Sequence, residues 1–161
     1  MEHLLLSVHV IGGIVFVGGS AVATSLFPRF APVAVTVSEG PTSEIPPSAR
    51  RSPDERNPAV AALLHRITRV YAVAALVVPL AGILLALLQS RMGEAWLTVS
   101  MLLTAAAGIL LAAQIHPRQR DALRRPGDRR ALRTLSMLSG FYNLLWAIVV
   151  VLMVVRPGEG G

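Results

Sequence analysis

Long apolar blocks alternate with short polar segments along the chain. The blocks predict four spans, each roughly 20 residues long, which is enough for an α-helix to cross about 30 Å of hydrocarbon. Apolar stretches of this length are uncommon in the core of a soluble protein. The pattern therefore predicts an all-α fold, a bundle of four transmembrane helices, with spans over residues 4–27, 67–88, 95–116 and 134–155.

The first block also resembles a signal peptide, because Ala21-Val22-Ala23 has the small-x-small pattern of a cleavage site. However, the residues before the block lack the basic region of a signal peptide, and the apolar run is longer than usual for one. We therefore expect a retained span.

Proline and the capping residues predict where helices begin and bend. The segment 28–57 is rich in proline, serine and threonine, so we expect a disordered loop. Asn57 followed by proline is typical of a helix start, so the second helix should begin well before the bilayer. Pro79 should kink that helix and free a carbonyl for a neighbouring hydroxyl. After a proline–glycine turn, Asp128 is predicted to cap the fourth helix.

Composition supports the membrane interpretation. Of the residues, 53% are hydrophobic and 15% are charged, and the mean hydropathy is +0.60, which is too apolar for a small soluble domain. The sequence contains no cysteine, so disulfides, thiolate zinc sites and cysteine nucleophiles are excluded.

The net charge is +6, the sequence has arginine but no lysine, and the arginines cluster between the apolar blocks. Such clusters favour anionic phospholipid headgroups as partners, and no recognised nucleic-acid-binding motif is present. All arginines except Arg91 and Arg156 belong to the first and third loops and their flanks. By the positive-inside rule these loops face the cytoplasm, which predicts a protein of the cytoplasmic membrane with both termini outside.

The first block carries a face of small residues around a histidine. Residues at spacings of three and four share one side of a helix, and small side chains there let another helix approach closely. A histidine on this face points into the bundle, where it either bonds a hydroxyl of another helix or binds haem or a metal. The face consists of His9, Gly12, Gly13, Phe16, Gly19, Ser20 and Ala23.

Two further histidines, His65 and His116, are expected at one depth at the cytoplasmic boundary. Two imidazoles at one depth can share a metal ion. Histidines beside arginines at an interface are equally well explained as solvated or headgroup-facing groups. His9 is expected near the outer face, so it cannot join them.

The fourth block has a small and polar face made by Ser136, Ser139, Gly140, Asn143 and Ala147. Asn143 should lie about 12 Å deep and must find a partner within the bundle. We expect this face to hold helices together rather than to bind a ligand. Trp96 is expected to anchor the third helix at the outer interface.

Catalytic and transport motifs are missing from the sequence. No span contains a carboxylate, so the usual proton-relay residues of transporters are absent. No nucleophile triad, phosphate-binding glycine loop or HExxH motif is present. The leading hypothesis is therefore a non-enzymatic accessory or interaction protein, possible partners being another membrane protein or lipid at the arginine-rich loops. The alternative is a redox protein that binds haem b or copper through His9.

Several short motifs resemble known families. Residues 8–13 (VHVIGG), 25–30 (SLFPRF), 143–146 (NLLW) and 152–158 (LMVVRPG) resemble an uncharacterised group of actinobacterial four-helix integral membrane proteins. This resemblance implies an envelope location and no assigned activity. More distantly, the histidine followed by small residues is similar to copper-resistance protein D and to HemJ-type membrane proteins. In those families this position, here His9, is thought to serve copper or haem.

Overall fold

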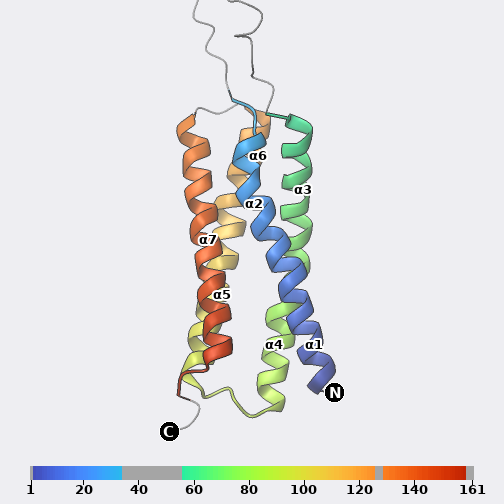
Figure 1. Cartoon of the computed structure of the whole chain (residues 1–161), viewed down its shortest axis with the longest axis vertical. Helices are drawn as coiled ribbons and strands as arrows, with labels where there is room; N and C mark the ends of the chain where they lie inside the picture. Colours follow the sequence, from blue (N-terminus) through green and yellow to red (C-terminus); the bar gives the residue numbers. More distant parts are fainter. Residues whose placement is uncertain (1, 34–55, 126–128, 159–161) are drawn as a thin grey trace, which may run out of the picture.

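Helical rods make up almost all of the computed structural model, which describes residues 2–33, 56–125 and 129–158 (Figure 1). Four rods are present in this part of the chain, so the predicted all-α bundle is confirmed. The elements in chain order are α1 (Glu2–Gly12), the π-helical turn η1 (Gly13–Val17), α2 (Gly18–Phe30), α3 (Pro58–Ala74), α4 (Val77–Leu88), α5 (Ala95–Leu110), the π-helical turn η3 (Leu111–Ile115), α6 (His116–Arg124) and α7 (Arg129–Val155).

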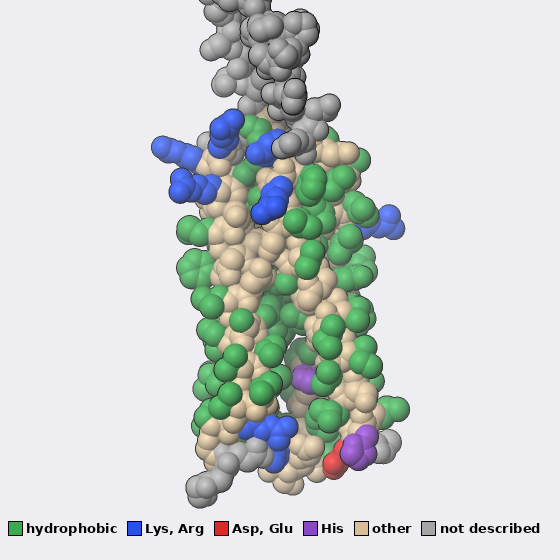
Figure 2. Space-filling view, viewed as in Figure 1, with side chains coloured by type: hydrophobic (Ala, Val, Ile, Leu, Met, Phe, Trp, Pro, Cys, Tyr) green, Lys and Arg blue, Asp and Glu red, His purple; other side chains and the backbone are tan. Residues whose placement is uncertain are grey.

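Each rod is long and apolar enough to cross a membrane. The rods cover Glu2–Phe30, Pro58–Leu88, Ala95–Arg124 and Arg129–Val155, and they contain 29, 31, 30 and 27 residues. Each includes an apolar stretch of 18 residues with a mean hydropathy of 2.0 to 2.6. Large apolar side chains cover the outside of the bundle (Figure 2). In water such a surface would be unstable, whereas hydrocarbon chains solvate it well.

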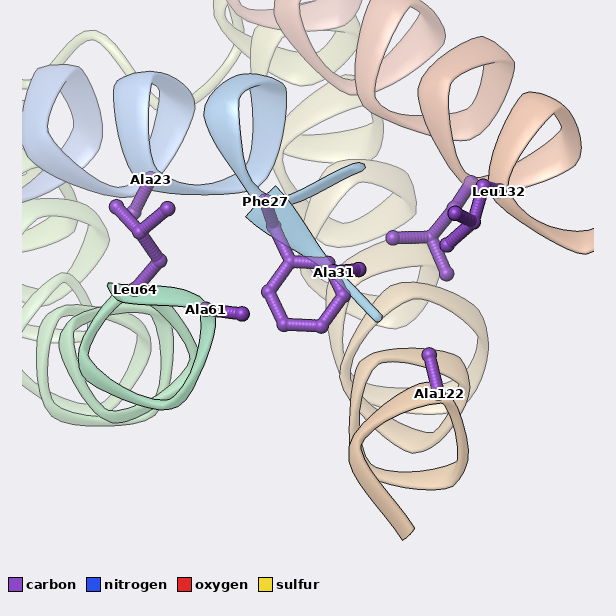
Figure 3. Close-up of a cluster of buried hydrophobic side chains, with 8 residues drawn as sticks. Ala23, Phe27, Ala31, Ala61, Leu64, Ala122 and Leu132 are labelled. Atoms are coloured by element: carbon purple, nitrogen blue, oxygen red, sulfur yellow. The ribbon is translucent and has the colours of Figure 1, made fainter. Parts of the chain in front are cut away.

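The first rod is central to the packing. Its α2 half packs against both α3 and α7, and its α1 half packs against α4. The third rod packs against α7 along α5 and against α3 through α6. A hydrophobic cluster around the fully buried Phe27 joins α2, α3, α6 and α7 at the end of the bundle where α3 begins (Figure 3).

Pro28 does not end the first helix, which continues to Phe30, beyond the expected limit of the span. Proline lacks an N–H, so it leaves the carbonyl of Thr24, four residues earlier, without its helical donor. Ser139 Oγ of α7 lies 3.0 Å from that carbonyl oxygen and 3.0 Å from Leu135 O, and its hydroxyl proton can serve either acceptor. A hydroxyl from another helix thus supports the helix at its internal proline.

Pro79 interrupts the second rod, and two turn residues separate α3 from α4. The carbonyl that Pro79 leaves without a donor belongs to Ala75, and it accepts the backbone N–H of Val78 at 3.0 Å. The interruption was predicted correctly, but the backbone, not a hydroxyl, supplies the donor. A tightened turn is therefore enough to satisfy this carbonyl.

The third rod also continues past its expected limit, through Pro117 to Arg124. Just before the proline, the His116 N–H bonds Leu111 O, five residues earlier, and forms the wide π-helical turn η3.

The Asn57 cap is confirmed, because its side chain accepts the N–H groups of Ala59 and Val60 at 3.0 and 3.3 Å. The Asp128 cap and residues 34–55 of the predicted disordered loop lie outside the described residues.

Candidate functional site

A ladder of polar contacts crosses the interior between α2 and α7. The hydroxyls of Ser20 and Tyr142 lie 2.8 Å apart, and both residues are buried. Ser20 also donates to Val17 O, so Tyr142 is the donor in the contact between helices. About one turn further along α2, Ser25 Oγ accepts a hydrogen bond from Asn143 Nδ2 at 2.9 Å. Together with Ser139, these bonds fix the register between the first and fourth rods.

The glycines of the first rod differ in what surrounds them. A Cβ added at Gly19 would overlap the ring of Tyr71, and one at Gly12 would lie 3.1 Å from a methyl of Val78. Close helix approach therefore depends on the missing side chain at Gly19, whereas at Gly12 the Val78 methyl would have to move by a few tenths of an ångström. A Cβ at Gly13 or Gly140 would meet nothing within 4 Å.

The remaining predicted packing residues also have defined places. Ala23 is buried and belongs to the Phe27 cluster. Ser20 and Asn143 take part in the polar ladder. On the predicted small face of α7, only Ser139 is fully buried, whereas Ser136, Gly140 and Ala147 are exposed. The structure thus divides this face into an inner edge and an outward stripe.

His9 contacts the second rod directly. Its Nδ1 lies 2.8 Å from the carbonyl oxygen of Val78. A carbonyl only accepts, so Nδ1 carries the proton, and in neutral His9 the lone pair lies on Nε2. Gly82 makes room for the ring, because a Cβ there would lie 2.9 Å from His9 Cε1. His9 is therefore oriented by a backbone carbonyl, not by the hydroxyl expected from the sequence.

The bundle opens in the half that contains His9. There α1 packs against α4, and α5 packs against α7. Figure 2 shows a hollow between these two pairs, away from the arginine-rich end. In the other half, side chains from α2, α3, α6 and α7 meet around Phe27 instead.

The structure brings His65 and His116 together at the α3–α6 contact. Their ring centroids lie 4.6 Å apart with an interplanar angle of 30°. His65 Nδ1 donates to Oε1 of the fully buried Gln119 at 3.1 Å. Among the described residues, no partner bonds His116 Nε2 or Gln119 Nε2.

This histidine pair has limited means to hold a metal ion. Within residues 2–33, 56–125 and 129–158, no group of three or more His, Cys, Asp or Glu side chains is placed to bind one. A metal between His65 and His116 would need further ligands from Gln119 or solvent. His9 bonds α4 at Val78, whereas His65 and His116 meet at the α3–α6 contact.

Sequence reasoning missed Tyr71, Gln119 and Tyr142, which complete these contacts. Each is a polar or aromatic residue within a rod, and a buried tyrosine or glutamine needs a hydrogen-bond partner. That requirement marks such residues as interior contacts, but it does not identify their partners. Ser20 and Tyr142 are far apart in the sequence, and only the packing of the rods joins them.

Aromatic and charged side chains meet at the opposite end of the bundle. Trp96 Nε1 donates to Glu94, and the guanidinium of Arg156 lies over the Trp96 ring at 5.9 Å. Arg91 forms an ion pair with Glu94 at 3.7 Å. This arrangement is typical of an interfacial anchor, the role expected for Trp96.

No family model, curated protein or solved structure matches the chain. The resemblances seen in the short motifs therefore remain predictions. The length, hydropathy and apolar surface of the rods lead to one conclusion. The chain is an integral membrane protein with four spans, in contact with bilayer lipid.

Proposed function

We propose that this protein is a non-enzymatic accessory or interaction subunit of the cytoplasmic membrane, and that it docks a transmembrane helix of a partner. The observation that carries this proposal is the outward stripe of Ser136, Gly140 and Ala147 on α7, which is exposed. These residues lie four and seven positions apart, so they share one side of the helix. Open space surrounds Gly140.

Small and polar residues of α2 border the stripe where α2 packs against α7. Asn143 lies at the edge of the stripe and bonds Ser25 of α2. Gly18 precedes Ser25 by seven residues, so it lies on the same face of α2, and a Cβ there would meet nothing within 4 Å. Lipid tails gain little from such a surface, whereas a partner helix gains close van der Waals contact and polar groups to bond.

The proposed orientation places both termini outside and the arginine-rich end in the cytoplasm. In Figure 1, α1 begins and α7 ends at the same end of the bundle. Arginine side chains gather around the other end in Figure 2. At the end with the chain termini, the arginines of the sequence are Arg91 and Arg156. The positive-inside rule supports this orientation.

The docking proposal is tested by placing bulky side chains on the stripe. Changing Gly140→Leu and Ala147→Leu together should block close approach of a partner helix. Helix contacts of this kind are worth about 1–2 kcal/mol, so the cross-linked complex in native membranes should fall by about 5–30-fold. The measurement is chemical cross-linking in membranes, followed by mass spectrometry to identify the captured chain.

Gly108→Leu is the matched control for this experiment. Gly108 is exposed on α5, and its Cβ position is open, so the change adds bulk to a different lipid-facing surface. The control should leave the complex intact, and both variants should keep the thermal stability of the parent chain in detergent. A complex that survives the double change, or parent membranes that yield no complex, would refute the proposal.

A second candidate function is redox chemistry with haem b or copper at His9. The observation that favours it is the Nδ1–H bond to the Val78 carbonyl. Histidines that bind metals almost always donate their other ring N–H to a carbonyl or carboxylate, which fixes the tautomer and aims the lone pair. His9 would supply one nitrogen ligand through Nε2, and the cofactor would supply the electron transfer.

This candidate predicts a cofactor that depends on His9. Protein purified from its native membranes should show a Soret band or contain copper, and His9→Ala should remove either signal. His3→Ala should leave the signal unchanged, because His3 is exposed and lies six residues before His9 on α1. Visible spectroscopy and metal analysis make the measurement. A parent protein that is colourless and free of copper would exclude this function.

A further inference from the structure

A cleft opens between α6 and α7 at the arginine-rich end of the bundle. Its volume is about 560 Å³. Arg118, Arg124 and Arg125 lie along its rim, and the rim also contains one carboxylate, Asp121. The side chain of Arg118 is positioned by a hydrogen bond from Nη1 to Gln114 O at 3.2 Å.

The charge of this rim selects an anion. The rim contains three guanidinium groups and one carboxylate, so the cleft carries an excess of positive charge. Guanidinium is planar and offers paired N–H donors that match the oxygens of a phosphate. Further arginines at the start of α7, Arg129, Arg130 and Arg133, add to the positive potential at this end.

The floor of the cleft is apolar. Ala122 of α6 and Leu132 and Leu135 of α7 line it, with exposed fractions of 7%, 5% and 2%. All three belong to the hydrophobic cluster around Phe27. A free inorganic phosphate would contact the rim and leave this floor without a partner.

A ligand that uses both parts must combine phosphate with hydrocarbon. The cleft lies where the third rod leaves its apolar stretch and the fourth rod enters one, as the sequence of both helices shows. Basic pockets between helices at this depth are typical sites for anionic lipid headgroups. We propose that the cleft binds an anionic phospholipid, with its phosphate on Arg118, Arg124 and Arg125 and the start of its acyl chains on the apolar floor.

The site is tested on the full chain purified in detergent. Native mass spectrometry measures the binding of dioleoyl phosphatidylglycerol and of dioleoyl phosphatidylcholine. The parent chain should prefer the anionic lipid. Changing all three rim arginines to glutamine should weaken phosphatidylglycerol binding on the order of 100-fold. Each basic residue near the membrane surface raises the affinity for an anionic lipid by about five- to tenfold.

A matched control separates a built site from general charge. Arg29→Gln, Arg66→Gln and Arg69→Gln together remove the same charge from exposed residues outside the cleft. This triple variant should change phosphatidylglycerol binding by less than about threefold if the effect is local. Equal loss in the two triple variants would overturn the proposal, as would equal binding of the two lipids by the parent chain.

A gain of binding provides a test that misfolding cannot imitate. Asp121→Asn removes the carboxylate of the rim and should tighten phosphatidylglycerol binding about fivefold. Unchanged or weaker binding would count against the site. Millimolar inorganic phosphate should not displace the lipid, because it cannot use the floor. Complete displacement would show a free-phosphate site instead and would also overturn the proposal.

Discussion

Replacing Phe27 with alanine should lower the free energy of unfolding by about 3–5 kcal/mol. Phe27 is fully buried, and its ring lies among residues from three other helices (Figure 3). Many of its neighbours are alanines, Ala31, Ala61 and Ala122 among them. Such short side chains cannot move into the space left by the ring, so the change leaves a cavity.

Phe141→Ala is the control for this prediction. Phe141 is 54% exposed on α7, on the surface that lipid covers. When its ring is removed, lipid fills the space, so the free energy of unfolding should change by no more than about 1 kcal/mol. Reversible unfolding of both variants in mixed micelles makes the comparison. Similar losses for the two phenylalanines would mean that the Phe27 cluster does not hold the bundle together.

The fold could be predicted from the sequence because a membrane imposes a length on each helix. A helix that crosses hydrocarbon needs about 20 apolar residues, and the four blocks meet that requirement without help from tertiary contacts. Local capping was equally readable, since Asn57 bonds two N–H groups within its own first turn. Both features depend only on neighbours in the sequence.

The continuation of helices through proline could not be predicted in this way. Pro28 reads as a helix end from its own residue type, yet the helix passes through it with Ser139 beside the freed carbonyl. The third rod likewise continues through Pro117, directly after the π-helical turn η3. In each case the donor or the backbone adjustment depends on packing that a local pattern does not contain.

The candidate sites were predictable as residue types and not as contacts. His9 was expected inside the bundle and bonded to a hydroxyl, but its partner is the backbone of Val78. A backbone carbonyl gives no signal in the sequence, because every residue has one. The contact between His65 and His116 depends on how α3 crosses α6, and Gln119 enters only through that crossing.

Gly19→Ala should destabilise the bundle by about 1–3 kcal/mol, the usual cost of adding a methyl group to a filled interior. The new Cβ would overlap the ring of Tyr71. Turning that ring aside would break its edge-on contact with Phe16, whose ring centroid lies 5.9 Å away. Either α2 and α3 must separate, or the aromatic pair must come apart. Thermal unfolding of the variant in detergent measures the loss.

Gly13→Ala, six residues earlier on the same rod, should change the stability of the bundle in the opposite direction. Nothing lies within 4 Å of its Cβ position, so the methyl group meets no protein atom. Alanine is favoured over glycine in a helix by up to about 1 kcal/mol, so this variant should match or exceed the stability of the parent chain. Opposite signs would assign the effect at Gly19 to the α2–α3 approach. A loss at both positions would assign it to a general need for glycine along the first rod, and the packing role of Tyr71 would then be refuted.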